Sequence, residues 1–172
     1  MRLGAKVQPG YYEQTMTSLD PNSTALEEIH NAYPRMDLTQ VRSALAAFLI
    51  RGDEVFNEIG ALSGGEKARI QLLKLMLSGA NLLLLDEPAS PLDPLMRDKL
   101  CQMIGDYISD GAGEKSVLFS THNISDMESI TDYAIIMEHG NVVECGFVED
   151  LKEKYILIKG DAQDAEAAYI IF

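Results

Sequence analysis

A run of four leucines is the sequence feature that most constrains the fold of this chain. Leu82–Leu85 is apolar at every position and is followed at once by two carboxylates, Asp86 and Glu87. A strand that is apolar throughout is typical of a parallel sheet covered by helices on both faces. Helix and strand patterns alternate from Ser63 onward, so we predict an α/β fold built on such a sheet.

The predicted elements before residue 63 are mainly helical. We expect a turn at Pro9–Gly10, a strand that ends near Gln14, a helix entered through a capping box of Thr24 and Glu27, and a second helix at about 37–50. After residue 63 we predict helices at 65–77, 94–109, 124–130, 147–154 and 161–168, and strands at 81–86, 116–120, 133–137, 142–144 and 155–158.

The length of 172 residues and a hydrophobic content of 47% suit a single domain with a substantial core. We expect 1–172 to form one truncated α/β domain. Its core would comprise 1–14 and 80–172, and 15–79 would form a small helical subdomain.

Charge and composition exclude several classes of partner. With 14 basic and 27 acidic side chains the net charge is -13, which disfavours direct binding of nucleic acid or anionic membranes. No apolar run reaches the roughly 18 to 20 residues of a membrane span, and no signal peptide follows Met1, so we expect a cytoplasmic protein. Cys101 and Cys145 are expected to be reduced thiols.

The segment Ser63, Gly64, Gly65 and Glu66 opens a predicted helix. Free backbone N–H groups at a helix N-terminus can hold a phosphate, and glycine lets the backbone approach it closely. Ser63 and Glu66 also have the spacing of a plain capping box. The residues alone favour neither interpretation.

Asp86 and Glu87 stand where a parallel sheet binds its ligands, at the carboxyl end of a strand. In nucleotide hydrolysis Asp86 would hold Mg²⁺ and Glu87 would orient the attacking water. His122 follows a second apolar strand and so should reach the same edge, where it could contact a terminal phosphate. Gln14 also ends a predicted strand, and its amide oxygen could complete the Mg²⁺ or water shell.

Two further segments have a structural interpretation. Asp93 precedes Pro94 and has the position of a helix N-cap. Residues 111–116 resemble a phosphate loop superficially, but they lack its spacing and precede a strand, so we interpret them as a connecting turn.

Together these motifs resemble the nucleotide-binding domain of ATP-binding cassette (ABC) proteins. In family order they are Gln14 for the Q-loop glutamine, 62–66 for the signature, 82–86 for Walker B, Glu87 for the catalytic glutamate, 90–93 with Asp93 for the D-loop, and His122 for the switch histidine. The resemblance implies ATP and Mg²⁺ as cofactors and a head-to-tail dimer with another ABC ATPase subunit. In the transporter version a membrane permease would dock near Gln14 and hold the chain at the inner face of the membrane.

Within the family the two halves resemble different relatives. Residues 10–77 are similar to the F subfamily, which acts on ribosomes, and residues 90–155 to ATPase subunits of bacterial ABC exporters. The seam falls between Asp86 and Ser90. A recombined or engineered chimera, or an atypical natural relative, would explain it.

The 172 residues contain no Walker A motif, the phosphate loop that grips the β- and γ-phosphates. We therefore expect weak ATP binding and little or no hydrolysis by the chain alone. Absence of the central strand and helix of that motif should also expose apolar surface and favour association. One hypothesis is an ABC ATPase module that works with a partner; the other is a non-catalytic fragment.

Overall fold

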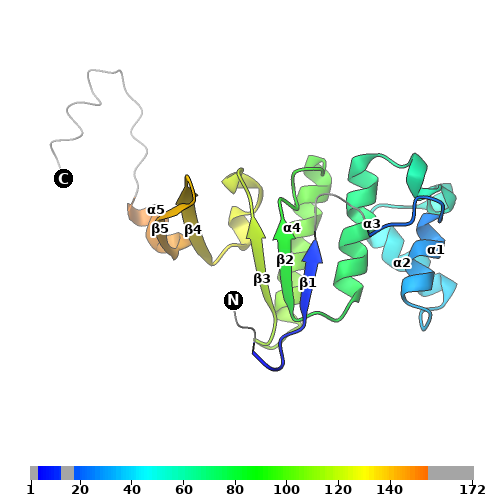
Figure 1. Cartoon of the computed structure of the whole chain (residues 1–172), viewed down its shortest axis with the longest axis horizontal. Coiled ribbons are helices and arrows are strands. Elements are labelled where there is room, and N and C mark those ends of the chain that lie inside the picture. The colour runs from blue at the N-terminus through cyan, green and yellow to red at the C-terminus, as the bar shows by residue number, and fades with distance from the viewer. Residues whose placement is uncertain (1–3, 13–17, 155–172) are drawn as a thin grey trace, which may run out of the picture. The chain divides into compact units, whose positions relative to one another are not determined.

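The computed structural model describes residues 4–12 and 18–154, and the chain divides after Ser129 into two compact units. Helices α1 to α5, 3₁₀ helices η1 to η4 and strands β1 to β5 follow the chain (Figure 1). Their bounds are β1 Pro9–Tyr12, α1 Ala25–Ala32, α2 Leu38–Ala47, η1 Gly52–Phe56, η2 Ile59–Ala61, α3 Gly64–Leu77, β2 Leu82–Asp86, α4 Pro94–Ser109, β3 Ser116–Ser120, η3 Ile124–Asp126, η4 Glu128–Ile130, β4 Tyr133–Glu138, β5 Asn141–Phe147 and α5 Val148–Lys154. The prediction of one domain with a helical subdomain at 15–79 is left untested by this division.

The first unit contains a sheet of three parallel strands in the order β1-β2-β3. Tyr12 pairs with Leu85, Leu85 pairs with Phe119, and Asp86 pairs with Ser120. The predicted α/β fold with a parallel sheet is confirmed. The pairing also brings the carboxyl ends of β2 and β3 to the same edge.

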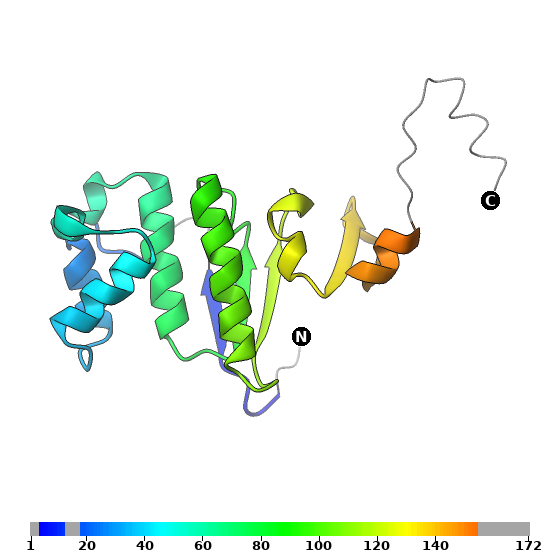
Figure 2. The ribbon, with the colours of Figure 1, turned by 180° about the vertical axis from the view of Figure 1, so that it is seen from behind.

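Helices α3 and α4 cover one face of this sheet, as the front and back views agree (Figures 1 and 2). Leu83 and Leu85 of β2 point toward these helices and are buried. Tyr11 and Leu118 lie in the other register row and are 61% and 56% exposed. Side chains of a strand alternate between faces, so the expectation that helices cover β2 on both faces is wrong for the described residues of this unit.

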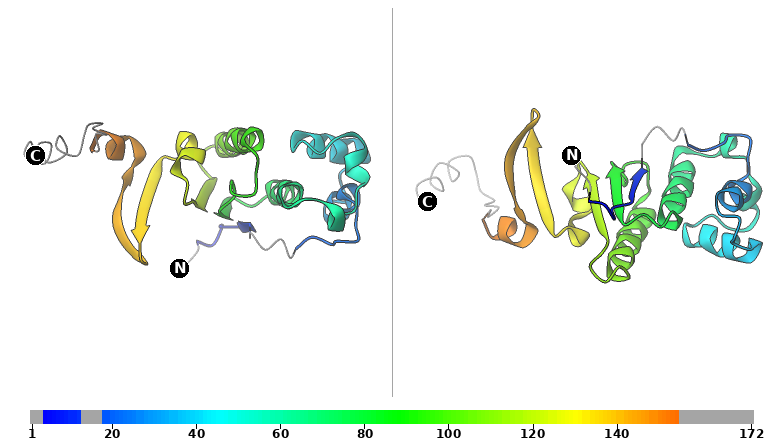
Figure 3. Two further views of the ribbon diagram at one scale, coloured as in Figure 1. Left: turned by 90° about the horizontal axis from the view of Figure 1, so that it is seen from above. Right: turned by 60° about the horizontal axis from the view of Figure 1, so that its bottom comes forward.

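The helices α1 and α2 lie beyond the edge strand β1, on the outer side of α3 (Figures 1 and 3). The predicted capping box of Thr24 and Glu27 is confirmed at the start of α1, and Asp37 begins α2 in the same way. A cap supplies acceptors for backbone N–H groups that the helix itself leaves unpaired. Helices α1 and α2 pack against each other, and Ile29 of α1 and Leu45 of α2 are both fully shielded from solvent.

The predicted turn at Pro9–Gly10 is wrong, because these two residues begin β1. The turn lies earlier, where the N–H of Val7 donates to the carbonyl oxygen of Gly4 at 3.1 Å. Proline is tolerated in an edge strand when its missing N–H would have pointed away from the neighbouring strand. The Pro9–Gly10 pair therefore marks an edge strand in this chain and not a turn.

The predicted helix at 124–130 is also wrong and is replaced by the short helices η3 and η4. Arg97 of α4 binds both carboxylate oxygens of Asp126 at 3.0 Å. The thiol of Cys101 donates to the Asp126 carbonyl oxygen at 3.3 Å, which takes the acceptor that a continuing helix would need. Contacts with α4 thus outweigh the local helical pattern.

The second unit contains an antiparallel hairpin of β4 and β5 followed by α5, as predicted. His139 and Gly140 form its two-residue turn with φ angles of 49° and 79°, the left-handed geometry that such hairpins require. The predicted strand at 155–158 and helix at 161–168 lie outside the described residues. Among the described helices none has the length and apolar character to cross a membrane.

Candidate functional site

The carboxyl ends of β2 and β3 are joined by a side-chain hydrogen bond. Asp86 ends β2 and Ser120 ends β3, directly opposite each other in the parallel register. The Ser120 hydroxyl donates to Asp86 Oδ1 at 2.6 Å. Ser120 was not among the predicted site residues. Its signal in the sequence was its place as the last residue of the strand that leads to His122.

Glu87 turns out of the strand with a φ of 49°, a left-handed conformation that non-glycine residues seldom adopt. Its backbone N–H donates to Ser120 Oγ at 3.2 Å, which fixes the turn. Its carboxylate Oε2 lies 2.5 Å from His122 Nδ1. The His122 side chain is 75% exposed and that of Glu87 is 24% exposed. The prediction that His122 shares an edge with the carboxylates is confirmed.

A hydrogen-bonded series runs from the Asp86 carboxylate through the Ser120 hydroxyl to the backbone N–H of Glu87, and the Glu87 carboxylate in turn contacts His122. Backbone strain of the kind seen at Glu87 is held only where the surroundings determine it, and it occurs often at functional sites. A carboxylate hydrogen-bonded to an imidazole can accept a proton from water and share the resulting charge. The arrangement therefore suits water activation at the sheet edge.

The loop after Glu87 leads into α4 through Asp93. Asp93 Oδ1 accepts a hydrogen bond from Met96 N at 3.1 Å, and Pro94 is the first helical residue. The interpretation of Asp93 as an N-cap is confirmed. A contact of Asp93 with nucleotide stays a prediction. Residues 111–116 join α4 to β3, so their interpretation as a connecting turn is also confirmed.

Ser63 and Glu66 form a complete capping box at the start of α3. Ser63 Oγ accepts from Glu66 N at 3.3 Å, and Glu66 Oε2 accepts from Ser63 N at 2.8 Å and from Ser63 Oγ at 2.6 Å. The side-chain and backbone hydrogen bonds from Ser63 lower the pKa of the Glu66 carboxyl below 4.5. The helix N-terminus thus already holds an anion from its own chain.

Gly65 brings the start of α3 against the loop after β2. A Cβ atom at Gly65 would lie 2.9 Å from the carbonyl oxygen of Pro91, closer than real contacts permit, whereas Gly64 faces open space. No hydrogen bond links Ser63 or Glu66 to Asp86, Glu87 or His122 in the part of the chain that the structure describes. The two predicted phosphate-handling segments are therefore separate sites, and the start of α3 closely approaches the loop after β2 at Gly65.

Gln14 and Asp86 are the two residues that the sequence predicts to bind Mg²⁺. Gln14, predicted to bind Mg²⁺ or nucleotide, lies outside the described residues. Within residues 4–12 and 18–154, no group of three or more His, Cys, Asp or Glu side chains could hold a metal ion. Mg²⁺ commonly takes one or two carboxylates and completes its shell with phosphates and water. Asp86, with an exposed carboxylate at the strand end, fits that partial role.

The parallel sheet, with its carboxylates and imidazole at the strand ends, is the architecture of nucleotide-binding α/β proteins. Residues 4–90 match the family described as ABC transporter, and the chain belongs to this family. YdiF of Bacillus subtilis is 41% identical over 104 residues, which are 60% of this chain and 16% of YdiF. The ATP-binding protein Uup of Escherichia coli is 28% identical over 175 residues, covering 94% of this chain and 26% of Uup.

Solved structures give the same fold. The ATP-binding cassette MJ0796, solved as a dimer in a post-hydrolysis state bound to ADP and Pi, has a TM-score of 0.68 and 20% identity. The match covers 83% of this chain and 63% of that one. The matched part of this chain spans about a sixth of the length of YdiF and about a quarter of the length of Uup.

Proposed function

We propose that this chain is an ABC ATPase module that hydrolyses ATP with Mg²⁺ at the edge formed by Asp86, Glu87 and His122. The observation that supports it most is the hydrogen-bonded series from Asp86 through Ser120 to Glu87 and His122. Two adjacent carboxylates are costly to hold together for structural reasons alone. A catalytic use accounts for both of them.

Each side chain has a distinct role in this proposal. Asp86 holds Mg²⁺ directly or through water, and the ion, when bound, neutralises charge on the phosphates. Glu87 Oε2 orients the attacking water and accepts its proton. His122, 2.5 Å from Glu87, keeps that carboxylate in place and can turn toward the terminal phosphate. The Ser120 hydroxyl holds Asp86 and the Glu87 backbone in register.

The second part of the proposal concerns a partner subunit. The sequence contains no Gly-x4-Gly-Lys-Ser/Thr segment, which in phosphate-loop proteins supplies most of the contacts to the β- and γ-phosphates. We therefore propose that the edge at Asp86, Glu87 and His122 turns over ATP only when a phosphate loop from outside these 172 residues completes it, and that the chain forms a head-to-tail dimer with another ABC subunit. In that dimer Ser63, Gly64 and Gly65 would close over the partner's ATP, with Asp93 beside it. The dimeric cassettes of similar fold support this arrangement.

Two processes are candidates for coupling to ATP hydrolysis: action on ribosomes and transport through a permease. Similarity to YdiF and Uup favours the F subfamily, whereas YxlF, an uncharacterized ABC transporter ATP-binding protein of Bacillus subtilis, is 38% identical over 96 residues and favours transport through a permease. The net charge of -13 disfavours direct contact with ribosomal RNA. We retain transport as the first candidate. A chimera of the two kinds of domain stays a proposal.

Calorimetry with ATP and Mg²⁺ tests the proposal. We expect no measurable heat from the chain alone, and more ATP binding and turnover in the mixture with an ABC subunit that carries a phosphate loop than that subunit shows by itself. No effect of the partner would favour a non-catalytic fragment. Rapid turnover by the pure chain, abolished by Glu87→Gln, would contradict the requirement for a phosphate loop from outside the chain.

A further inference from the structure

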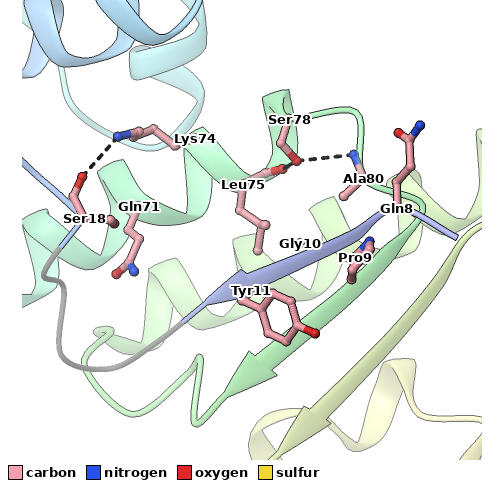
Figure 4. Close-up of a pocket in the computed structure, with 10 residues that line it drawn as sticks. All are labelled: Gln8, Pro9, Gly10, Tyr11, Ser18, Gln71, Lys74, Leu75, Ser78 and Ala80. Atoms are coloured by element: carbon pink, nitrogen blue, oxygen red, sulfur yellow. Dashed lines mark hydrogen bonds between the residues drawn. The ribbon is translucent and has the colours of Figure 1, made fainter. Parts of the chain in front are cut away.

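A groove of about 330 Å³ lies between β1 and the C-terminal half of α3 (Figure 4). One wall is the strand segment Gln8–Tyr11, and the other carries Gln71, Lys74, Leu75 and Ser78. Helix α3 packs so closely on the strand that a Cβ atom at Gly10 would lie 2.5 Å from Leu75 Cδ1. The groove shares no residue with the hydrogen-bonded series at the ends of β2 and β3.

The strand wall of the groove is a free sheet edge. β1 is the outermost strand of the order β1-β2-β3. The carbonyl oxygen of Gln8 accepts from Leu82 N at 3.3 Å, which sets the direction of the ladder. Backbone groups of successive strand residues point to alternate sides, so those of Pro9 and Tyr11 point away from β2. Among the described residues, no backbone hydrogen bond reaches Pro9 or Tyr11 from that outer side.

The helix wall adds a buried acceptor without a partner. Gln71 is only 7% exposed, it lines the groove, and its Oε1 atom makes no hydrogen bond. A buried acceptor left unpaired is costly and unusual in a folded protein. Lys74 does not satisfy it, because its ammonium group binds Glu28 Oε1 at 2.5 Å and the Ser18 carbonyl oxygen at 3.3 Å.

The outer backbone edge of β1 therefore presents more acceptors than donors. The outward carbonyl groups of Pro9 and Tyr11 and the Gln71 oxygen accept, whereas Pro9 has no N–H and Tyr11 supplies the outward backbone donor of this strand. A matching ligand presents several donors in an extended row. The net charge of -13 attracts positively charged partners over longer distances.

We propose that this groove binds an extended, basic peptide segment of a partner protein, which adds to the outer edge of β1 as a further strand. The segment's backbone N–H groups donate to Pro9 and Tyr11, and its carbonyl accepts from Tyr11 N–H. A further donor of the segment satisfies Gln71 Oε1. Strand addition of this kind takes its affinity from main-chain hydrogen bonds and its selectivity from neighbouring side chains.

The probe is an acetylated, amidated heptapeptide of alternating arginine and valine, titrated into the ¹⁵N-labelled 172-residue chain and followed by NMR. We expect saturable shifts of the Tyr11 backbone amide and the Gln71 side-chain amide. A peptide with N-methyl groups on alternate backbone nitrogens, and one with glutamate in place of arginine, should bind at least about tenfold more weakly. Equal binding of either control overturns the proposal, and so does the absence of saturable shifts.

Matched variants separate the edge from general effects on the fold. Tyr11→Pro removes the outward N–H while Gly10, which precedes it, avoids the usual clash before proline. Tyr11→Val changes the same side chain but keeps the N–H. We expect Tyr11→Pro and Gln71→Leu each to weaken binding about tenfold, and Tyr11→Val to bind as the parent does.

Circular dichroism checks that each variant is folded. If Tyr11→Pro is unfolded, peptide binding by Gln71→Leu tests the proposal by itself. Unchanged peptide affinity in Gln71→Leu overturns the proposal. Concentration-dependent shifts of the same amides without peptide would assign the edge to a second copy of the chain, and would overturn it as well.

Discussion

The start of α3 and the edge of the sheet at β2 and β3 both contain a carboxylate with a hydrogen-bonded partner. They differ in how these groups come together and in whether the arrangement is complete without a ligand. At the helix, Ser63 and Glu66 are three residues apart and satisfy each other and the helix amides. At the sheet edge, Glu87 and His122 are 35 residues apart and meet because two parallel strands end together. The first arrangement is complete without a ligand, whereas the second exposes the carboxylate of Asp86 and the ring of His122 to solvent.

This difference shows how little residue type alone says about a site. A hydroxyl beside a carboxylate is a helix cap in one place and the link between two strand ends in the other. A ligand at the helix N-terminus has to displace or join the Glu66 carboxylate, because that group already occupies the region of positive potential. At the sheet edge a cation faces carboxylates without such competition. The edge is therefore the better candidate for Mg²⁺ chemistry.

The largest expected effect is that of Glu87→Gln on ATP turnover at the edge of Asp86, Glu87 and His122, once a phosphate-loop segment completes that edge. We expect a loss of about a hundredfold or more, because the amide cannot accept a proton from water. Steady-state phosphate release measures it. Glu114→Gln, a carboxylate exposed in the turn before β3, is the matched control and should leave the rate unchanged.

Ser120→Ala should have the next largest effect, about a tenfold loss of turnover, because the hydroxyl bridges Asp86 and the Glu87 backbone. Ser120→Thr keeps the hydroxyl and should restore most of the rate. The same assay measures both variants. If alanine and threonine reduced turnover equally, the hydroxyl would have no positioning role at this edge.

Ser63→Ala should act mainly on stability rather than on turnover by the chain's own edge. Loss of an N-cap costs about 1 kcal/mol of unfolding free energy, which urea denaturation detects. Ser90→Ala, an exposed serine in the loop before Asp93, is the control. If Ser63→Ala left stability unchanged but strongly reduced turnover, the start of α3 would have a functional role and not mainly a structural one.

The smallest expected effect is the pH dependence that Glu66 contributes. Its pKa is lowered in the folded chain by the hydrogen bonds from Ser63, so its stabilisation is present above pH 4.5 and is lost as pH falls through the lowered value. Glu66→Gln retains a hydrogen-bonding side chain but cannot titrate. The variant should therefore show a shallower loss of unfolding free energy below pH 4.5, and identical pH profiles would exclude this contribution.

Sequence reasoning succeeded where the determining interactions are local or follow from strand order. The caps at Thr24 and Asp93 are set within three residues, and the meeting of Glu87 with His122 follows from parallel strands ending at one edge. It failed where a distant element decides. The helix expected at 124–130 is broken by contacts of Arg97 and Cys101, which no local pattern reveals.

Two features of the site could not be predicted from patterns. Ser120 acquires its role from facing Asp86 in the register, and its place at the end of a strand does not by itself predict that contact. The left-handed backbone at Glu87 is unusual for glutamate and is fixed by a hydrogen bond from its N–H to a neighbouring strand. Both depend on pairing between strands that are distant in sequence.

The contact of Gly65 with the Pro91 carbonyl bears on how movement passes between the two regions. Backbone faces backbone at this point because Gly65 has no side chain, so the first turn of α3 cannot tilt toward the loop without displacing Pro91. That loop begins at Glu87 and ends at the Asp93 cap. A subunit that pressed on the start of α3 would therefore shift the chain segment that carries the glutamate, with no side chain to absorb the motion.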